Sequence, residues 1–383
     1  MISSYQSIFL KLILLDMKIG LVTSAFLEST LPLYKRLSQQ ENVEVELIVV
    51  AHVDFLTLPS LNLENFTHRA GDFLDKKDVR ILLSSYLDTR ALEGVRIYIG
   101  KGLLGKFVVS NRLINFLREQ RFNALLMVNF SFRLFSISAS RISRETKILW
   151  LCHEVLPNRI IDRDAGLLKK VKGKIELNLA IYAYKNCSGL ICLSKNERLK
   201  FESLKLSGVP VHTVSLGPFE KSFSDYKERS LPNFIESNNY ILFVGYLRSY
   251  KGIEFLLESI ANHKSLKRLT FVFAGRDEIG IRKYVFSDNI IVIDKFLDDQ
   301  EINNLMANCR ACIIPYQTAS QSGIPLLASA FRKPIIASNI DGINEYVENG
   351  ENGVLFEYGD QISLLRAIEM IEDDKFVSRI KMN

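Results

Sequence analysis

The chain has 383 residues, of which 48% are hydrophobic and 24% are charged, and it carries a net charge of +6. This balance is typical of a soluble globular protein and argues against a disordered chain, while the length favours two domains of about 150 to 200 residues each. Five cysteines, an odd number, argue against a disulfide framework and favour a reducing, cytoplasmic environment.

The positive charge is concentrated in the N-terminal half. Residues 1–216 contain 30 lysines and arginines against 20 acidic residues, whereas residues 217–383 contain 19 against 23. A basic half-chain suits an anionic membrane face, a pyrophosphate-bearing acceptor or a nucleic acid. The sequence contains none of the familiar nucleic-acid-binding motifs, so we expect no nucleic-acid partner.

The first residues do not predict a membrane span. The apolar segment SIFLKLILLDMKIGLV is interrupted by Lys11 and Asp16, and it lacks the roughly 18 uninterrupted apolar residues that a span needs. It also lacks a small-residue cleavage site, which argues against a signal peptide. Because Met17 directly precedes the first clear strand, we interpret residues 1–16 as an N-terminal extension or a misassigned start.

Between residues 17 and 217, apolar runs alternate with helix-like runs, which is typical of a parallel sheet covered by helices on both faces. The predicted strands are Lys18–Thr23, Val45–Val50, Val95–Ile99, Ala124–Val128, Ile148–Cys152, Gly189–Leu193 and Val211–Leu216. The predicted helices are Leu31–Gln39, Ser110–Gln120, Lys170–Tyr184 and Lys195–Leu204.

Residues 218–238 are polar and contain two prolines, so they are predicted to link this domain to a second one at residues 239–383. The second domain shows the same alternation, and its last predicted helix is Gln361–Ile371. Its predicted strands are Tyr240–Val244, Leu269–Ala274, Ile290–Ile293, Ala311–Pro315, Pro334–Ala337 and Gly353–Phe356. We therefore expect an α/β protein of two doubly wound, Rossmann-like domains that face each other across a cleft.

The turn after strand Tyr240–Val244 concentrates positive charge. Gly245 is followed by Arg248 and Lys251, directly before an amphipathic helix. Two long cations and a helix N-terminus at the carboxyl end of a strand can hold a diphosphate. Ser322 and Gly323 repeat the arrangement after strand Ala311–Pro315, which favours a nucleotide-diphosphate ligand.

Several segments of this half resemble one family. They are GYLRSYKG, FAGR, PYQTASQSGIPLLASAFRKPIIAS and GINEYVENGENGVLF, and the N-terminal half adds WLCHE and ICLSKNE. In this order and spacing they resemble the retaining glycosyltransferases of the GT-B fold, specifically glycosyltransferase family 4, also called group 1. The resemblance is stronger over residues 240–360 than over residues 17–216.

The resemblance implies roles for individual residues. Arg248 and Lys251 match the basic pair that binds the donor diphosphate, in the R-x-Y-K-G version of the motif, with Tyr246 at the more usual arginine position. His153 matches the N-terminal histidine that contacts the donor sugar. The implied catalytic residues are thus His153, Arg248 and Lys251. The implied donor-binding residues are Gly245, Arg248, Lys251, Arg276, Ser320, Ser322, Gly323 and Glu345.

The chain departs from the family at two carboxylates. Ser320 and Ala328 stand where the family has the two glutamates that bind the donor sugar and the ribose. The chain also ends at RIKMN, where members of the family usually continue into helices that return to the N-terminal domain. Both departures leave open a protein with impaired catalysis that binds a nucleotide sugar or a partner transferase.

A basic segment, GLLKKVKGKIELNLAIYAY, indicates a second surface. Lys169, Lys170, Lys172 and Lys174 alternate with apolar side chains, a pattern that suits contact with an anionic lipid surface or a lipid-linked acceptor as well as an ordinary solvated face. No metal site is expected, because Cys309 and Cys312 form a single pair and the nearest D-x-D follows no suitable strand.

The sequence therefore predicts a metal-independent, retaining glycosyltransferase without a cofactor other than its nucleotide-sugar substrate. Its acceptor is expected to be a saccharide, lipid-linked as in surface polysaccharide assembly, at the cytoplasmic face of the membrane. Two alternatives remain open: the impaired binding protein and a nucleotide-sugar epimerase, which shares the architecture but needs acidic catalytic residues in the cleft. The sequence does not name the donor sugar, its base, the acceptor or the linkage.

Overall fold

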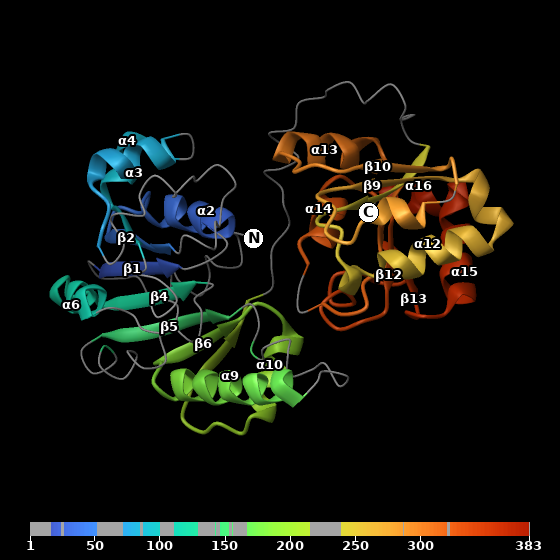
Figure 1. The fold of residues 1–383 in the computed structure, drawn as a ribbon. Helices are drawn as coiled ribbons and strands as arrows, with labels where there is room; N and C mark the ends of the chain where they lie inside the picture. Colours follow the sequence, from blue (N-terminus) through green and yellow to red (C-terminus); the bar gives the residue numbers. More distant parts are fainter. Residues whose placement is uncertain are drawn as a thin grey trace. The chain divides into compact units, whose positions relative to one another are not determined.

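The structure is a computed structural model that describes residues 17–23, 27–51, 72–84, 87–99, 111–128, 142, 146–152, 155, 167–214, 239–285, 287–319 and 322–382. The chain divides into two compact units, residues 2–215 and residues 216–383. The predicted extension at residues 1–16 and the predicted linker at residues 218–238 lie outside the described residues. Figure 1 shows parallel strands side by side in each unit, with helices packed around them.

The N-terminal unit contains a seven-stranded sheet in which every strand pair is parallel, in the order β3-β2-β1-β4-β5-β6-β7. The strands are β1 (Met17–Thr23), β2 (Val43–Ala51), β3 (Val95–Ile99), β4 (Ala124–Val128), β5 (Lys147–Cys152), β6 (Gly189–Cys192) and β7 (Val211–Thr213). The described helices are α2 (Leu27–Leu37), α3 (Lys76–Leu83), α4 (Thr89–Glu93), α6 (Asn111–Glu119), α9 (Leu167–Lys185) and α10 (Lys195–Ser203).

The central strands of this sheet are apolar along their whole length because both faces are covered. All five residues of β4 and all four of β6 are buried. Continuous burial of this kind is what a parallel sheet between two helical layers requires. Trp150 on β5 and Tyr184 on α9 meet edge to face in the core, with ring centroids 6.2 Å apart.

The C-terminal unit contains a six-stranded, all-parallel sheet in the order β10-β9-β8-β11-β12-β13. The strands are β8 (Tyr240–Val244), β9 (Thr270–Ala274), β10 (Ile290–Ile293), β11 (Ala311–Ile314), β12 (Ile335–Ser338) and β13 (Gly353–Phe356). The described helices are α12 (Ile253–Asn262), α13 (Asp299–Asn308), α14 (Ile324–Ala330), α15 (Gln361–Glu372) and α16 (Asp374–Met382), with 3₁₀ turns η2 (Ser249–Lys251), η3 (Lys264–Arg268) and η4 (Ile281–Tyr284).

This strand order has a functional consequence. The chain proceeds from β8 to β9 and β10 on one side, then returns to place β11, β12 and β13 on the other side. The reversal between β8 and β11 is a topological switch point, and in doubly wound sheets the crevice for a ligand lies at the carboxyl ends of two such strands. Ligands of doubly wound sheets bind at such a crevice, so the loops after β8 and β11 are the first place to look for a site.

The predicted strands are confirmed, and the bounds of β3, β4, β8, β10 and β13 agree at both ends. The prediction missed helices α3, α4 and α16. These are short, and α4 is stabilised by a cap, because the Asp88 side chain accepts a hydrogen bond from Ala91 N at 2.8 Å. An Asp before a five-residue helix is a weak signal among so many acidic residues.

Candidate functional site

The loops after β8 and β9 run side by side at the carboxyl edge of the C-terminal sheet. Gly245 N donates to Ala274 O at 2.9 Å, Leu247 N donates to Arg276 O at 2.9 Å, and Glu278 N donates to Leu247 O at 3.1 Å. The hydrogen bonding between β8 and β9 thus continues past the ends of both strands. These backbone hydrogen bonds fix the two loops relative to each other, and with them the positions from which their side chains extend.

Two glycines are required by this close packing. A Cβ at Gly275, where φ is 147°, would lie 2.1 Å from Gly245 O. A Cβ at Gly252, where φ is 67°, would lie 1.7 Å from Pro315 O in the loop after β11. Gly252 therefore lets the turn before α12 touch the β11 loop, which brings the two sides of the switch point together.

Lys251 occupies the centre of this contact. Its Nζ lies 5.9 Å from the ring centroid of Phe243 and 5.2 Å from that of Tyr316, and a Cβ at Gly245 would be 2.8 Å from it. Among the described residues no carboxylate pairs with this ammonium group. Burial, together with the charge of Arg248, lowers the pKa of Lys251 from 10.5 to about 8. A buried charge that no described carboxylate contacts directly, beside two aromatic rings, is poised to bind an anion.

Arg248 is held by a carboxylate from the neighbouring loop. Its Nε and Nη2 donate to Glu278 Oε2 and Oε1 at 2.7 and 2.8 Å, and its guanidinium lies 5.0 Å from the ring centroid of Tyr246. The hydrogen bonds raise the pKa of Arg248 and lower that of Glu278. Both side chains are about two-fifths exposed, so the guanidinium still faces solvent.

The two cations lie where the sequence placed them, between β8 and α12. The intervening residues form the 3₁₀ turn η2 and then Gly252, after which α12 begins at Ile253. Ser249 Oγ donates to Glu254 Oε1 at 2.8 Å and ties this turn to the first turn of the helix. The partial positive charge at the N-terminus of α12 adds to that of Arg248 and Lys251.

The loop after β11 lies on the other side of the switch point. Gln317 N donates to Tyr250 O at 2.9 Å, which ties this loop to η2. Ser322 Oγ accepts from Ile324 N at 3.3 Å, and Gly323 directly precedes α14. Ser320 lies outside the described residues, and Ala328 is fully buried on α14.

Two further predicted donor-binding residues sit at the same edge of the sheet. Arg276 is exposed directly after β9, and Glu345 is partly buried in the turn that follows β12. Since the carboxyl ends of parallel strands share one edge, both residues belong to the same rim as Arg248 and Lys251.

In the N-terminal unit, His153 and Glu154 lie outside the described residues, but both neighbours of this pair are buried. Val155 N donates to Glu197 Oε2 at 2.6 Å, and Tyr184 Oη donates to Val155 O at 2.8 Å. Glu197 is 1% exposed and also accepts from Lys200 Nζ at 2.6 Å. Glu197 lies within the segment ICLSKNE, but no local signal in the sequence indicates that its carboxylate accepts a hydrogen bond from the backbone N–H of Val155, 42 residues earlier.

The basic segment forms the long helix α9. Val171, Lys174 and Ile175 are exposed near its start, and Tyr182 is exposed on the same face two turns further on. The side chains of Lys169, Lys170 and Lys172 are outside the described set. The exposed face thus combines apolar side chains with a lysine.

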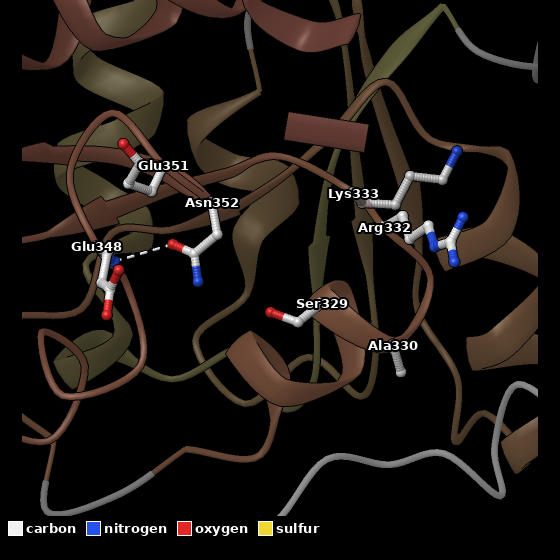
Figure 2. A pocket seen from close by; sticks show the side chains of 7 residues that line it. All are labelled: Ser329, Ala330, Arg332, Lys333, Glu348, Glu351 and Asn352. Atoms are coloured by element: carbon white, nitrogen blue, oxygen red, sulfur yellow. Dashed lines mark hydrogen bonds between the residues drawn. The ribbon is translucent and has the colours of Figure 1, made fainter. Parts of the chain in front are cut away.

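A polar hollow of about 380 Å³ lies at the opposite edge of the C-terminal sheet, before β12 and β13 (Figure 2). Its lining includes Lys333 and Asn352, and both are already engaged: Lys333 Nζ donates to Cys309 O at 2.8 Å, and Asn352 Oδ1 accepts from Glu348 N at 2.9 Å. These bonds support turns at the amino ends of the strands. The hollow is therefore not part of the site at the switch point.

Two general features complete the description. Within the described residues, no three histidine, cysteine, aspartate or glutamate side chains come together as a metal site. Among the described helices, none has both the length and the apolar character needed to cross a bilayer.

The comparison with solved structures identifies the fold. HepE from Anabaena in complex with UDP-glucose is 17% identical, with a TM-score of 0.65 over 96% of this chain and 93% of that one. The apo form of WaaB, a lipopolysaccharide outer core galactosyltransferase, is 12% identical, with a TM-score of 0.62 over 96% of this chain and 94% of that one. The chain has the GT-B fold, as predicted.

The sequence comparison matches part of the C-terminal unit to one family. Residues 238–374 match the family described as glycosyl transferases group 1. An uncharacterized glycosyltransferase of Methanocaldococcus jannaschii is 26% identical over 55% of this chain and 57% of its own length. The UDP-Gal:alpha-D-GlcNAc-diphosphoundecaprenol alpha-1,3-galactosyltransferase of Escherichia coli is 26% identical over 54% and 56%. The chain thus spans little more than half the length of these two relatives.

Proposed function

We propose that the protein transfers a sugar, with retention, from a nucleotide-diphosphate sugar to a saccharide acceptor. The observation that carries this proposal is Lys251, a charged side chain without a carboxylate partner among the described residues, at the carboxyl end of β8 beside the switch point. A diphosphate is the ligand whose charge best matches Lys251, Arg248 and the N-terminus of α12.

In the proposed reaction, the bond between the anomeric carbon and the diphosphate oxygen breaks. The acceptor hydroxyl forms the new bond on the same face of the sugar, and its proton passes to the departing phosphate oxygen. Lys251 and Arg248 stabilise the negative charge that develops on the leaving group. They supply fixed positive charge in the place where other transferases use a divalent metal, so the proposal requires no metal. His153, the remaining predicted catalytic residue, is assigned to contact with the donor sugar.

The remaining donor contacts are assigned by position. We assign Ser322 and Gly323 to the diphosphate, because they precede α14 in the β11 loop, and Arg276 and Glu345 to the rim of the same crevice. Gly245 is assigned to close backbone approach, since a Cβ there would meet Lys251 Nζ at 2.8 Å. Ser320 and Ala328 replace the family glutamates, so donor preference is not carried over from the relatives.

The acceptor is proposed to be a lipid-linked saccharide at the cytoplasmic face of a membrane, in surface polysaccharide assembly. The E. coli relative is named for a diphosphoundecaprenol acceptor, and the basic segment of α9 suits an anionic lipid surface. The exposed Val171 and Ile175 beside Lys174 support this contact. Replacing Lys174 and Ile175 with glutamate and serine should reduce co-sedimentation with phosphatidylglycerol vesicles, and unchanged co-sedimentation would contradict it.

The donor assignment is tested by measuring the thermal stabilisation of the purified protein by UDP-, GDP-, ADP- and dTDP-sugars, with and without magnesium. One donor should raise the melting temperature without metal, and Arg248→Ala with Lys251→Ala should remove the shift. An unchanged shift in the double variant would contradict the assignment of the diphosphate to these cations.

Product analysis separates the two alternatives. An epimerase releases no glycosylated product with any acceptor and instead interconverts nucleotide sugars or frees the nucleoside diphosphate. A protein with impaired catalysis binds one donor but forms neither product, and Ser320 and Ala328 are the residues that would explain this result.

A further inference from the structure

We infer that Glu278 is a positioning residue that holds Arg248 in the orientation needed to bind the donor diphosphate. This inference rests on the proposed function, because it concerns the same crevice. The sequence offers no sign of it, since Glu278 lies 30 residues after Arg248 in a different loop. The structure brings the two side chains together through the loops that follow β8 and β9.

The geometry of the ion pair leaves part of the guanidinium available. Glu278 occupies Nε and Nη2 of Arg248, which is the side-on arrangement. A guanidinium has five N–H donors, so three are not used by Glu278, and a side-chain hydrogen bond with Tyr250 uses part of these. The donors that remain lie on the side away from Glu278 and can form hydrogen bonds to phosphate oxygens. The carboxylate therefore orients the guanidinium without using up its binding capacity.

Several hydrogen bonds hold the loop that carries Glu278. The preceding residue, Asp277, accepts hydrogen bonds from Ile279 N, Gly280 N and Ile281 N at 3.0, 2.8 and 2.7 Å. Glu278 N itself donates to Leu247 O at 3.1 Å, directly before Arg248. The backbones of the two partners are thus joined beside their side-chain contact. Little conformational freedom remains to be lost when a ligand binds.

Glu278 makes two charge-assisted hydrogen bonds that restrain Arg248. Its side chain is 44% exposed, and besides Glu278 it lies 5.0 Å from the ring centroid of Tyr246 and forms a side-chain hydrogen bond with Tyr250. A long exposed side chain without a partner samples many rotamers, and fixing it on ligand binding costs entropy. Because Glu278 already restricts the rotamers of Arg248, less side-chain entropy is lost when the donor binds.

Simple electrostatics makes the opposite prediction, which makes the inference testable. Glu278 brings a negative charge close to a site for an anion, and its removal raises the local positive charge by one. If Glu278 only competes with the diphosphate for Arg248, Glu278→Gln should tighten binding. If Glu278 positions Arg248, the same substitution should weaken binding despite the gain in charge.

The experiment measures the affinity of the full chain for UDP and for inorganic pyrophosphate, which carries the diphosphate common to all donors. Glu278→Gln should weaken binding about tenfold. Glu278→Asp keeps the charge but shortens the side chain, and it should weaken binding as well. Glu254→Gln is the matched control, because it removes a carboxylate from the first turn of α12 that pairs with Ser249 and not with Arg248. Glu254→Gln should bind as tightly as the natural chain or slightly more tightly.

A double-substitution cycle shows whether Glu278 acts through Arg248. In an Arg248→Ala background, Glu278→Gln should no longer weaken binding, because the side chain that it positions is gone. If Glu278→Gln tightens binding, leaves it unchanged, or weakens it equally in both backgrounds, the inference is wrong.

A measurement without ligand separates this inference from the proposed function. The ¹⁵N–¹H resonance of Arg248 Nε, identified by its loss in Arg248→Lys, should exchange slowly with water in the natural chain and quickly in Glu278→Gln. If no nucleoside diphosphate or pyrophosphate binds the natural chain, the proposed function fails. An Arg248 Nε resonance that Glu278→Gln leaves unchanged overturns the positioning role whether or not the ligands bind.

Discussion

Replacing Lys251 with methionine should stabilise the C-terminal unit and abolish donor binding at the same time. Burial lowers the pKa of this lysine from 10.5 to about 8. Since one pKa unit corresponds to about 1.4 kcal/mol, the charged form is about 3 kcal/mol less favourable in the folded chain than in the unfolded one. Methionine has a similar length, carries no charge and packs well against the rings of Phe243 and Tyr316. We expect Lys251→Met to raise the free energy of unfolding at pH 7 by about 1 to 3 kcal/mol.

The pH dependence gives this prediction a second, independent part. Between pH 8 and pH 10.5 the unfolded chain binds the lysine proton and the folded chain does not, so this group makes the natural chain more stable as the pH rises. Lys251→Met lacks this contribution. The stability advantage of the variant should therefore be largest near pH 7 and shrink toward pH 10.

The assay is urea unfolding followed by far-ultraviolet circular dichroism at about pH 7.0, 8.5 and 9.5, which bracket the pKa of Lys251. UDP binding is measured at each pH. Lys251→Arg is the control, because it keeps the charge in the same place and should not stabilise the fold. A Lys251→Met variant that is less stable than the natural chain, or equally more stable at every pH, would refute the claim that this lysine is held charged at a cost.

Three further predictions concern the same parts of the structure. Diphosphate binding should weaken above pH 8, by up to about tenfold per pH unit, because the anion needs the protonated form of Lys251. Calorimetry in buffers of different ionisation enthalpy should detect the uptake of a proton on binding. An affinity that is constant from about pH 7 to 9 would contradict this prediction. Gly252→Ala should destabilise the fold by at least about 2 kcal/mol, since its φ is 67° and the new Cβ would meet Pro315 O, with Gly350→Ala as a control at positive φ in open space. Glu197→Ala should cost about 3 to 5 kcal/mol in unfolding free energy, because it leaves Lys200 and the Val155 amide without their buried acceptor, and a loss below about 1 kcal/mol would show that this contact is not needed.

Much of the fold could be predicted from the sequence because its strands lie in parallel sheets buried on both faces. Such strands are short, continuous apolar runs such as Tyr240–Val244 and Ala124–Val128, and the period and length of these runs are visible locally. The three missed helices, α3, α4 and α16, are held largely by packing against their neighbours. Their local patterns are too short to distinguish from turns.

The candidate site was predictable in part for the same reason. Arg248 and Lys251 are close in sequence to strand β8 and helix α12, so a local pattern was enough to place both at a helix start. The family segments then indicated the donor diphosphate. By themselves, however, these residues did not show which cation is buried and which is exposed.

The sequence by itself determined the α/β architecture and the position of the basic pair, and the resemblance to glycosyltransferase family 4 predicted that Ser320 and Ala328 replace two glutamates. Only the tertiary structure decided that Lys251 lies over the rings of Phe243 and Tyr316, that Glu278 pairs with Arg248 and that Glu197 accepts a hydrogen bond from Val155 N. The physical reason is that strand propensity and helix polarity act over a few neighbouring residues. Burial, the pKa of a lysine and the partner of a carboxylate depend on groups that the sheet order brings together from distant parts of the chain.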